Sequence, residues 1–124
     1  MTRAVICLLL FFVNNCFAEW KDWSDTDKGL FVASTVAMTA DWMTTRYYSK
    51  HQSDFPQYYE TNPILGKHPT AQSVDLYFAA LVVSNYYIAD WLPPEFRGFY
   101  LGLRTGAHAS AAMGNVRIGW KMQF

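Results

Sequence analysis

The stretch FRGFYLGLRTGAHASAAMG, residues 96–114, gives the clearest indication of the fold. A small residue recurs in it at every fourth position, so the small side chains share one face of an α-helix. They are Gly98, Gly102, Gly106, Ser110 and Gly114. In a lipid bilayer such a face lets another helix backbone approach closely, because packing takes over from the hydrophobic drive that lipid removes. We therefore expect a helix that packs against another helix, of this chain or of a second copy.

Two apolar stretches on its N-terminal side indicate two more helices. Residues 30–48, LFVASTVAMTADWMTTRYY, follow the polar sequence SDTDKG, which is rich in residues that cap helix N-termini. Residues 73–92, SVDLYFAALVVSNYYIADWL, are numerous enough to cross a bilayer, with Thr70 placed as a cap and two prolines after the run. The sequence thus predicts an all-α fold, a small integral membrane bundle of about three helices.

The first eighteen residues have the pattern of a secretory signal peptide. Arg3 supplies the positive charge, AVICLLLFFV the short apolar core, and CFA the small residues before a cleavage site at Glu19. Cleavage would leave residues 19–124 as one membrane-embedded helical domain, and it would remove both cysteines, Cys7 and Cys16. The alternative is an uncleaved N-terminal anchor.

The net charge and the aromatic content limit the classes of binding partner that the sequence favours. The net charge is zero, which excludes the basic footprint of a nucleic-acid-binding protein. Aromatic residues make up 18% of the chain, and many lie at the ends of the apolar runs, as rings do at a membrane–water boundary. We expect membrane lipid as a partner, together with another copy of the chain or a partner helix.

Basic residues predict the orientation. If the N-terminus is periplasmic, three helices place more basic residues on the cytoplasmic side than outside, as the positive-inside rule requires. Those residues are Arg46, Lys50, Lys67, Arg117 and Lys121. This favours the bacterial inner membrane. The tail NVRIGWKMQF alternates apolar and polar residues, which is typical of the last strand of an outer-membrane protein and makes that membrane the alternative. We expect the tail itself to form a short strand or an interfacial extension.

Ionisable residues inside the apolar stretches are candidates for a functional site, because a charge in a membrane is costly. Asp41 lies in the first stretch, and Arg104 and His108 lie four residues apart on one face of the third. We expect Asp41 to pair with Arg104 or with His108. Such a pair could order the bundle or take part in catalysis.

The connecting sequence YYETNPILGKHPT, residues 58–70, has a structural interpretation. Asn62 can cap a short helical turn that begins at Pro63, and Gly66 can adopt the left-handed conformation that ends it. Glu60 has no such explanation. Glu60, Asp41 and His108 could together form a carboxylate–imidazole cluster for general acid–base catalysis. No metal-binding spacing and no cofactor motif is present in the sequence, so we expect neither.

Four of these sequences, ADWMTTRYY, YYETNPILGKHPT, LPPEFR and GNVRIGWKMQF, resemble a group of small membrane proteins of bacteria and their phages that have no established activity. The resemblance covers most of residues 19–124 and implies a helical architecture. It implies the shared positions Asp41, Thr45, Glu60, Asn62, Pro63, Gly66, His108 and Asn115. It carries no mechanism over.

Three functions fit these observations. The first is a small polytopic envelope protein with a structural or interaction role, built around a polar cluster that includes Thr45, Asn62, Arg104 and Asn115. The second is an intramembrane hydrolase or transferase acting on a lipid-linked substrate. In it Asp41 and Glu60 would be acid–base groups, His108 a proton shuttle and Arg104 an anion clamp. The third is a phage lysis or exclusion factor, which needs helices but no active site.

Overall fold

The computed structural model describes residues 19–124, and this part of the chain is all-helical without a strand. Its elements are η1 (Trp20–Asp22), α2 (Asp25–Lys50), η2 (Gln52–Asp54), α3 (Ala71–Trp91) and α4 (Pro94–Arg117). The prediction of an all-α fold is confirmed. The predicted signal peptide lies outside the described residues. None of the helices in residues 19–124 is at once long and apolar enough to cross a membrane.

The helices begin at residues whose local chemistry favours a start. Ser24 precedes α2, and its hydroxyl accepts a hydrogen bond from the Asp27 N–H at 3.0 Å. Thr70 does the same for α3, accepting from the Ser73 N–H at 3.1 Å. Pro94 occupies the first turn of α4, where the missing N–H is not needed. The start of each helix is therefore encoded in the neighbouring sequence.

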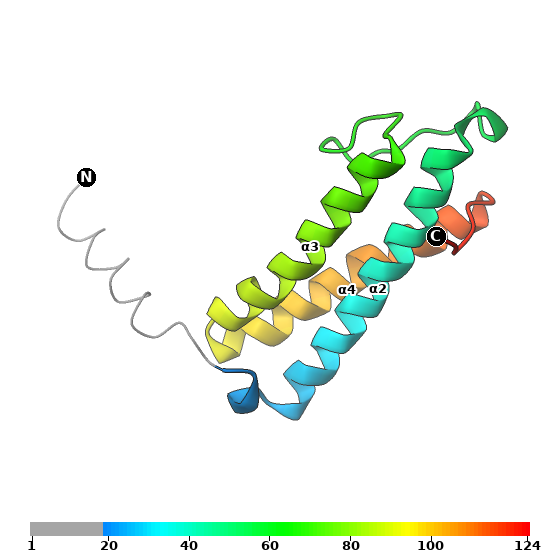
Figure 1. Ribbon diagram of the computed structural model, residues 1–124. Coiled ribbons are helices and arrows are strands. Elements are labelled where there is room, and N and C mark those ends of the chain that lie inside the picture. The colour runs from blue at the N-terminus through cyan, green and yellow to red at the C-terminus, as the bar shows by residue number, and fades with distance from the viewer. Residues whose placement is uncertain (1–18) are drawn as a thin grey trace, which may run out of the picture.

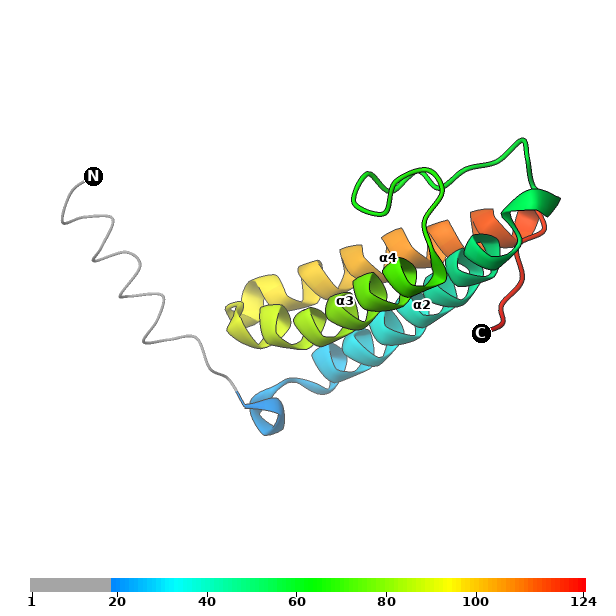
Figure 2. The ribbon, with the colours of Figure 1, turned by 45° about the horizontal axis from the view of Figure 1, so that its top comes forward.

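The central element is α2, which packs against both other helices and most extensively against α4. Figure 1 shows α3 and α4 joined by a tight turn at one end of the bundle and diverging toward the other end, where they have few contacts. The connection between α2 and α3, residues 51–70, arches over this open end of the bundle in Figure 2. The fold thus leaves space between α3 and α4 beneath a long loop.

Each end of the bundle has its own cluster of buried rings. At the closed end, Trp23 packs with Ala89 and Leu101. At the open end, Tyr48 stacks on Trp120, with ring centroids 4.2 Å apart. Trp120 follows α4, so the C-terminal tail is part of the packing that supports the loop.

The tail differs from the prediction of a strand. The helix α4 continues through Asn115 to Arg117, and a turn at Ile118 and Gly119 follows, with Gly119 at φ +98°. The last residues then fold back along α2, where the Phe124 ring meets the Trp42 ring at 5.3 Å. The alternation of apolar residues reflects Trp120 and Phe124 packing on different neighbours.

The small-residue face of α4 is mostly turned away from the other helices. Only Gly98 lies close to α2, because a Cβ atom there would come within 3.3 Å of the Asp27 carboxylate. At Gly102, Gly106 and Gly114 a Cβ would meet nothing within 4 Å, and Ser110 is exposed. Within this chain the stripe is therefore not the seam between helices beyond Gly98, and its packing against a second copy stays a prediction.

Candidate functional site

A buried side-chain hydrogen bond joins the middle of α2 to α4. The Nδ1 atom of His108 lies 2.7 Å from Oδ2 of Asp41, and the two residues are only 9% and 8% exposed. Since an ionised carboxylate can only accept, the hydrogen of this bond belongs to Nδ1. The Nε2 atom of His108 then remains for a second interaction. Of the two partners expected for Asp41, the structure brings His108 to it.

The second carboxylate oxygen of Asp41 is held by polar neighbours. Oδ1 accepts from the Thr45 hydroxyl at 3.3 Å and from the Asn115 amide at 3.5 Å. The same Asn115 amide donates to the Thr44 hydroxyl at 2.9 Å. Thr44, Thr45 and Asp41 lie on the face of α2 that meets α4. These contacts fix the carboxylate in one orientation.

The loop motif around Glu60 is closed by its own hydrogen bonds. The Asn62 N–H donates to Oε1 of Glu60 at 2.8 Å, and the Asn62 side chain accepts from the Ile64 N–H at 2.9 Å. The Gly66 N–H returns to the Asn62 carbonyl at 3.0 Å, and Gly66 adopts φ +77°. The motif is thus a single capped turn. Glu60 takes part in it by accepting a backbone hydrogen bond.

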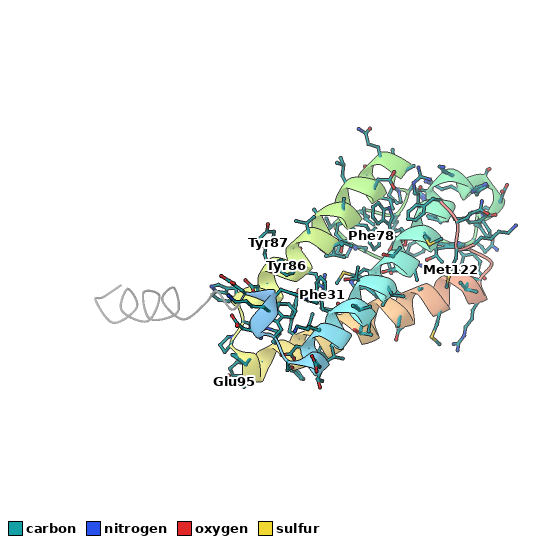
Figure 3. All side chains as sticks on the ribbon, turned by 60° about the horizontal axis from the view of Figure 1, so that its bottom comes forward. Phe31, Phe78, Tyr86, Tyr87, Glu95 and Met122 are labelled. Carbon is teal, nitrogen blue, oxygen red and sulfur yellow. The ribbon has the colours of Figure 1, made fainter. Side chains whose placement is uncertain are left out.

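A cavity of about 550 Å³ lies where this loop covers the gap between α3 and α4. The polar residues that line it are Asp41, Thr45, Glu60, Thr61, Asn62, Ser110 and Asn115. The others are Pro63, Ile64, Leu65, Phe78, Ala111 and Gly114. Figure 3 shows Phe78 on α3 at the side of that helix facing α2. The cavity therefore brings together α2, the loop, α3 and α4.

Glu60 and Asp41 influence each other across this cavity. Burial raises the pKa of the Glu60 carboxyl above its usual range, and the negative charge of Asp41 raises it further. The N–H groups of Asn62 and Thr61 act in the opposite direction, because they stabilise the ionised form. A carboxyl group in this environment holds its proton at a higher pH than an exposed glutamate does.

Tyr48 connects the loop to the bundle. Its hydroxyl donates to the Tyr58 carbonyl at 3.0 Å and lies 3.2 Å from Nδ1 of His68. Its ring is fully buried against Trp120. Tyr48 was not among the residues singled out from the sequence, although its spacing from Asp41 and Thr45 places all three on one face of α2. That spacing is the signal that could have identified it.

Arg104 lies apart from this site. It is partly buried on α4, its Nε atom has no hydrogen-bond partner among the described residues, and it does not line the cavity. The structure therefore does not bring Arg104 to Asp41 or to Glu60. An anion clamp formed by Arg104 beside those carboxylates is not what the geometry provides.

A second polar group lies at the closed end and holds the start of the described chain. Arg97 is buried, donates from Nε to the Ala89 carbonyl at 2.7 Å, and lies over the Trp23 ring. The Trp23 indole donates to Asp90 at 3.0 Å. Because every partner is part of the protein, we assign this group a structural role.

Residues 19–124 contain no group of three or more His, Cys, Asp and Glu side chains arranged to hold a metal ion. No protein-family model, no curated protein and no solved structure matches the chain.

Proposed function

We propose that this chain is a small membrane-embedded protein of the bacterial envelope, and that its polar cavity binds a ligand. The observation that carries the binding role is the cavity lined by both Asp41 and Glu60. The membrane setting rests on a separate observation, the distribution of polar and apolar side chains over the helices.

Several polar side chains are buried on helices that also expose large apolar side chains. On α3, Asn85 is fully buried and bonded to Ser34 of α2 at 2.9 Å, whereas Val83, two positions earlier, is 59% exposed. The same holds on α4, where His108 is buried and Leu103 is exposed. Large exposed apolar surfaces are uncommon in soluble monomers. In a bilayer this arrangement is favourable, because lipid solvates the apolar exterior and the bundle satisfies the polar groups.

Aromatic residues at both ends support the same setting. Trp20, Tyr87 and Phe96 are exposed at the closed end, and Tyr59 and Phe124 at the open end. Rings of this kind collect at the two membrane–water boundaries. Figure 3 shows Tyr86 and Tyr87 well separated along α3 from Phe78, and Phe78 is one of the residues that line the cavity.

A purely structural polar cluster would not account for the cavity. The contacts among Asp41, His108 and Asn115 order the bundle without any help from Glu60. Glu60 adds a second, partly desolvated carboxylate on the same cavity, which raises the energy of the empty protein. A cost of this kind is common at functional sites.

Acid–base catalysis is a second candidate, favoured by the hydrogen bond between His108 and Asp41. A carboxylate bonded to Nδ1 holds the imidazole in the tautomer whose Nε2 can accept a proton. Under this candidate, Asp41→Asn would abolish turnover of a bound lipid-linked substrate without releasing it. Loss of binding together with turnover would favour the ligand-binding role alone.

Two glycines offer a matched test of ligand binding. Gly114 lines the cavity and Gly106 does not, yet both lie on the open face of α4, where a side chain meets nothing within 4 Å. In Gly114→Phe the new ring fills the cavity. We expect native mass spectrometry of detergent-purified protein to detect a bound small molecule in the wild type and in Gly106→Phe, and to lose it in Gly114→Phe. Equal occupancy in both variants, or none in the wild type, would contradict the binding role.

A further inference from the structure

The charges around the cavity are of one sign. Asp41 and Glu60 line it, and no lysine or arginine is among the described residues that do. Arg104, the cation expected there, is elsewhere on α4. A phosphate or carboxylate ligand would therefore meet two carboxylates without a compensating cation, which is unfavourable in a partly desolvated site.

Glu60 forms no ion pair with any residue in the part of the chain that the structure describes. Asp41 is paired with His108, whereas the partners of the Glu60 carboxyl within residues 19–124 are the backbone N–H groups of Asn62 and Thr61, which carry no net charge. The nearest basic residue of the loop, Lys67, forms no ion pair with it. The Lys67 ammonium lies 5.1 Å from the centroid of the Tyr59 ring instead. A ligand can supply the positive charge that the described protein does not.

The rest of the cavity lining is suited to an organic group. Pro63, Ile64 and Leu65 contribute apolar surface from the loop, and Phe78 and Ala111 contribute it from the helices. Apolar side chains do not coordinate a metal ion, but they can bury a hydrocarbon chain attached to a charged group. The polar and apolar residues together define a ligand with a cationic end and an apolar body.

We propose that this cavity binds an organic monocation, a protonated amine with a short apolar chain, whose ammonium group lies between Glu60 and Asp41. This inference rests on the ligand-binding role proposed above and names the chemical class of the ligand. The ammonium would donate to the Glu60 carboxylate, with Thr45 and Asn62 available as further acceptors on the same cavity. The chain would lie along Phe78 and Leu65.

Binding of three probes of equal chain length tests the charge preference. Octylamine, octanol and octyl phosphate are titrated into the full chain in neutral detergent micelles by calorimetry, with empty micelles as the blank. We expect octylamine to bind at least about tenfold more tightly than octanol, with octyl phosphate the weakest. Glu60→Gln keeps the acceptor for the Asn62 N–H and should lower the octylamine affinity about tenfold without changing that of octanol. The exposed Asp54→Asn is the matched control and should change neither.

The outcomes separate this inference from the function on which it rests. Equal binding of octylamine and octanol, or tighter binding of octyl phosphate, overturns the cation preference and leaves a ligand cavity in place. Binding of none of the probes, with Gly114→Phe matching the wild type in bound small molecules, overturns the binding role itself. Displacement of octylamine by Mg²⁺ or Ca²⁺ overturns the inference in favour of a metal ion.

The amine could belong to a free compound or to a lipid head group, and bilayer discs distinguish the two. Discs of phosphatidylcholine with and without phosphatidylethanolamine are compared for octylamine binding. Competition by phosphatidylethanolamine supports a lipid amine, and undiminished binding supports a free one.

Discussion

Asp41 is the residue on which the polar contacts between α2 and α4 converge. Its two oxygens accept from His108, Thr45 and Asn115. A buried carboxylate is stable only when donors surround it, so the three partners and Asp41 depend on one another. The pairing with His108 could be predicted because both are ionisable residues in apolar stretches. Asn115 could be expected in a polar cluster, but its hydrogen bonds to Asp41 and Thr44 could not be predicted, since they depend on α4 continuing beyond the last small residue.

Removing this carboxylate should destabilise the bundle strongly. In Asp41→Ala the imidazole of His108 and the amide of Asn115 lose a buried partner, at a cost of roughly 2–4 kcal/mol in the free energy of unfolding. Chemical denaturation in detergent, followed by circular dichroism, measures the loss. Asp75→Ala is the comparison variant, because Asp75 is partly exposed and accepts from Arg46 and from the Trp42 indole; its removal should cost less, about 1 kcal/mol. An equal loss in the free energy of unfolding in the two variants would show that the buried contacts of Asp41 stabilise the fold no more than the contacts of Asp75 do.

Glu60 should make stability depend on pH. Its pKa is raised by burial and by Asp41, so the folded protein holds the Glu60 proton more tightly than the unfolded chain does. The stabilisation is fully present below the ordinary pKa of glutamate and is lost as pH rises through the raised value. Unfolding temperatures measured at pH values between the ordinary glutamate pKa and the raised pKa of Glu60 should show this decline in the wild type and not in Glu60→Gln. A decline of the same size in Glu60→Gln would assign it to another group.

At the level of elements, local chemistry was the reliable guide. The helix starts at Ser24 and Thr70, and the turn made by Asn62 and Gly66, follow from side-chain caps and from glycine geometry that act within a few residues. The end of α4 was not predictable in this way. It is set by Trp120 packing on Tyr48, a contact between residues far apart in the sequence. The alternation of apolar and polar residues in the tail suggested a strand, because this local pattern contains no information about the contact between Trp120 and Tyr48.

Two glycines with equal space around them should respond in opposite ways to alanine. Gly66 has φ +77°, so Gly66→Ala should cost roughly 1–2 kcal/mol even though a Cβ meets nothing within 4 Å. Gly106 is in the middle of α4, so Gly106→Ala should gain about 1 kcal/mol from helix propensity. Denaturation of both variants measures the difference. A loss of stability or of self-association in Gly106→Ala would instead indicate that the small-residue face packs against a second copy.

For the whole molecule, the number of helices was predictable and their arrangement was not. Three apolar stretches with caps predict three helices, but nothing in the sequence states that α2 lies against both others while α3 and α4 diverge. The cavity exists because of that divergence. This is why Asp41 and Glu60 could be expected in one cluster from the sequence, whereas the cavity that they share and the position of Arg104 outside its lining could not be predicted.

The proposed membrane topology places the two ends of the bundle on opposite sides. Both cysteines precede residue 19, so a cleaved chain carries none, and single cysteines can be introduced cleanly. Glu95→Cys at the closed end should react with an impermeant maleimide from the periplasm, and Asp54→Cys at the open end only after lysis (Figure 3 labels Glu95). Val83→Cys, exposed and apolar in the middle of α3, should stay unlabelled in membranes. Labelling of all three in intact cells would contradict an embedded bundle.

The stacking of Tyr48 on Trp120 has a consequence for the order in which the molecule is assembled during synthesis. The loop that covers the cavity leaves the ribosome well before Trp120, yet Tyr48, which holds that loop through the Tyr58 carbonyl, is buried only once Trp120 arrives. The nascent chain therefore carries α2 and an unsupported loop until α4 and the residues after it have been made. The cavity should be the last part of the described chain to form, and a ribosome stalled before residue 120 would display the helices without a closed cavity.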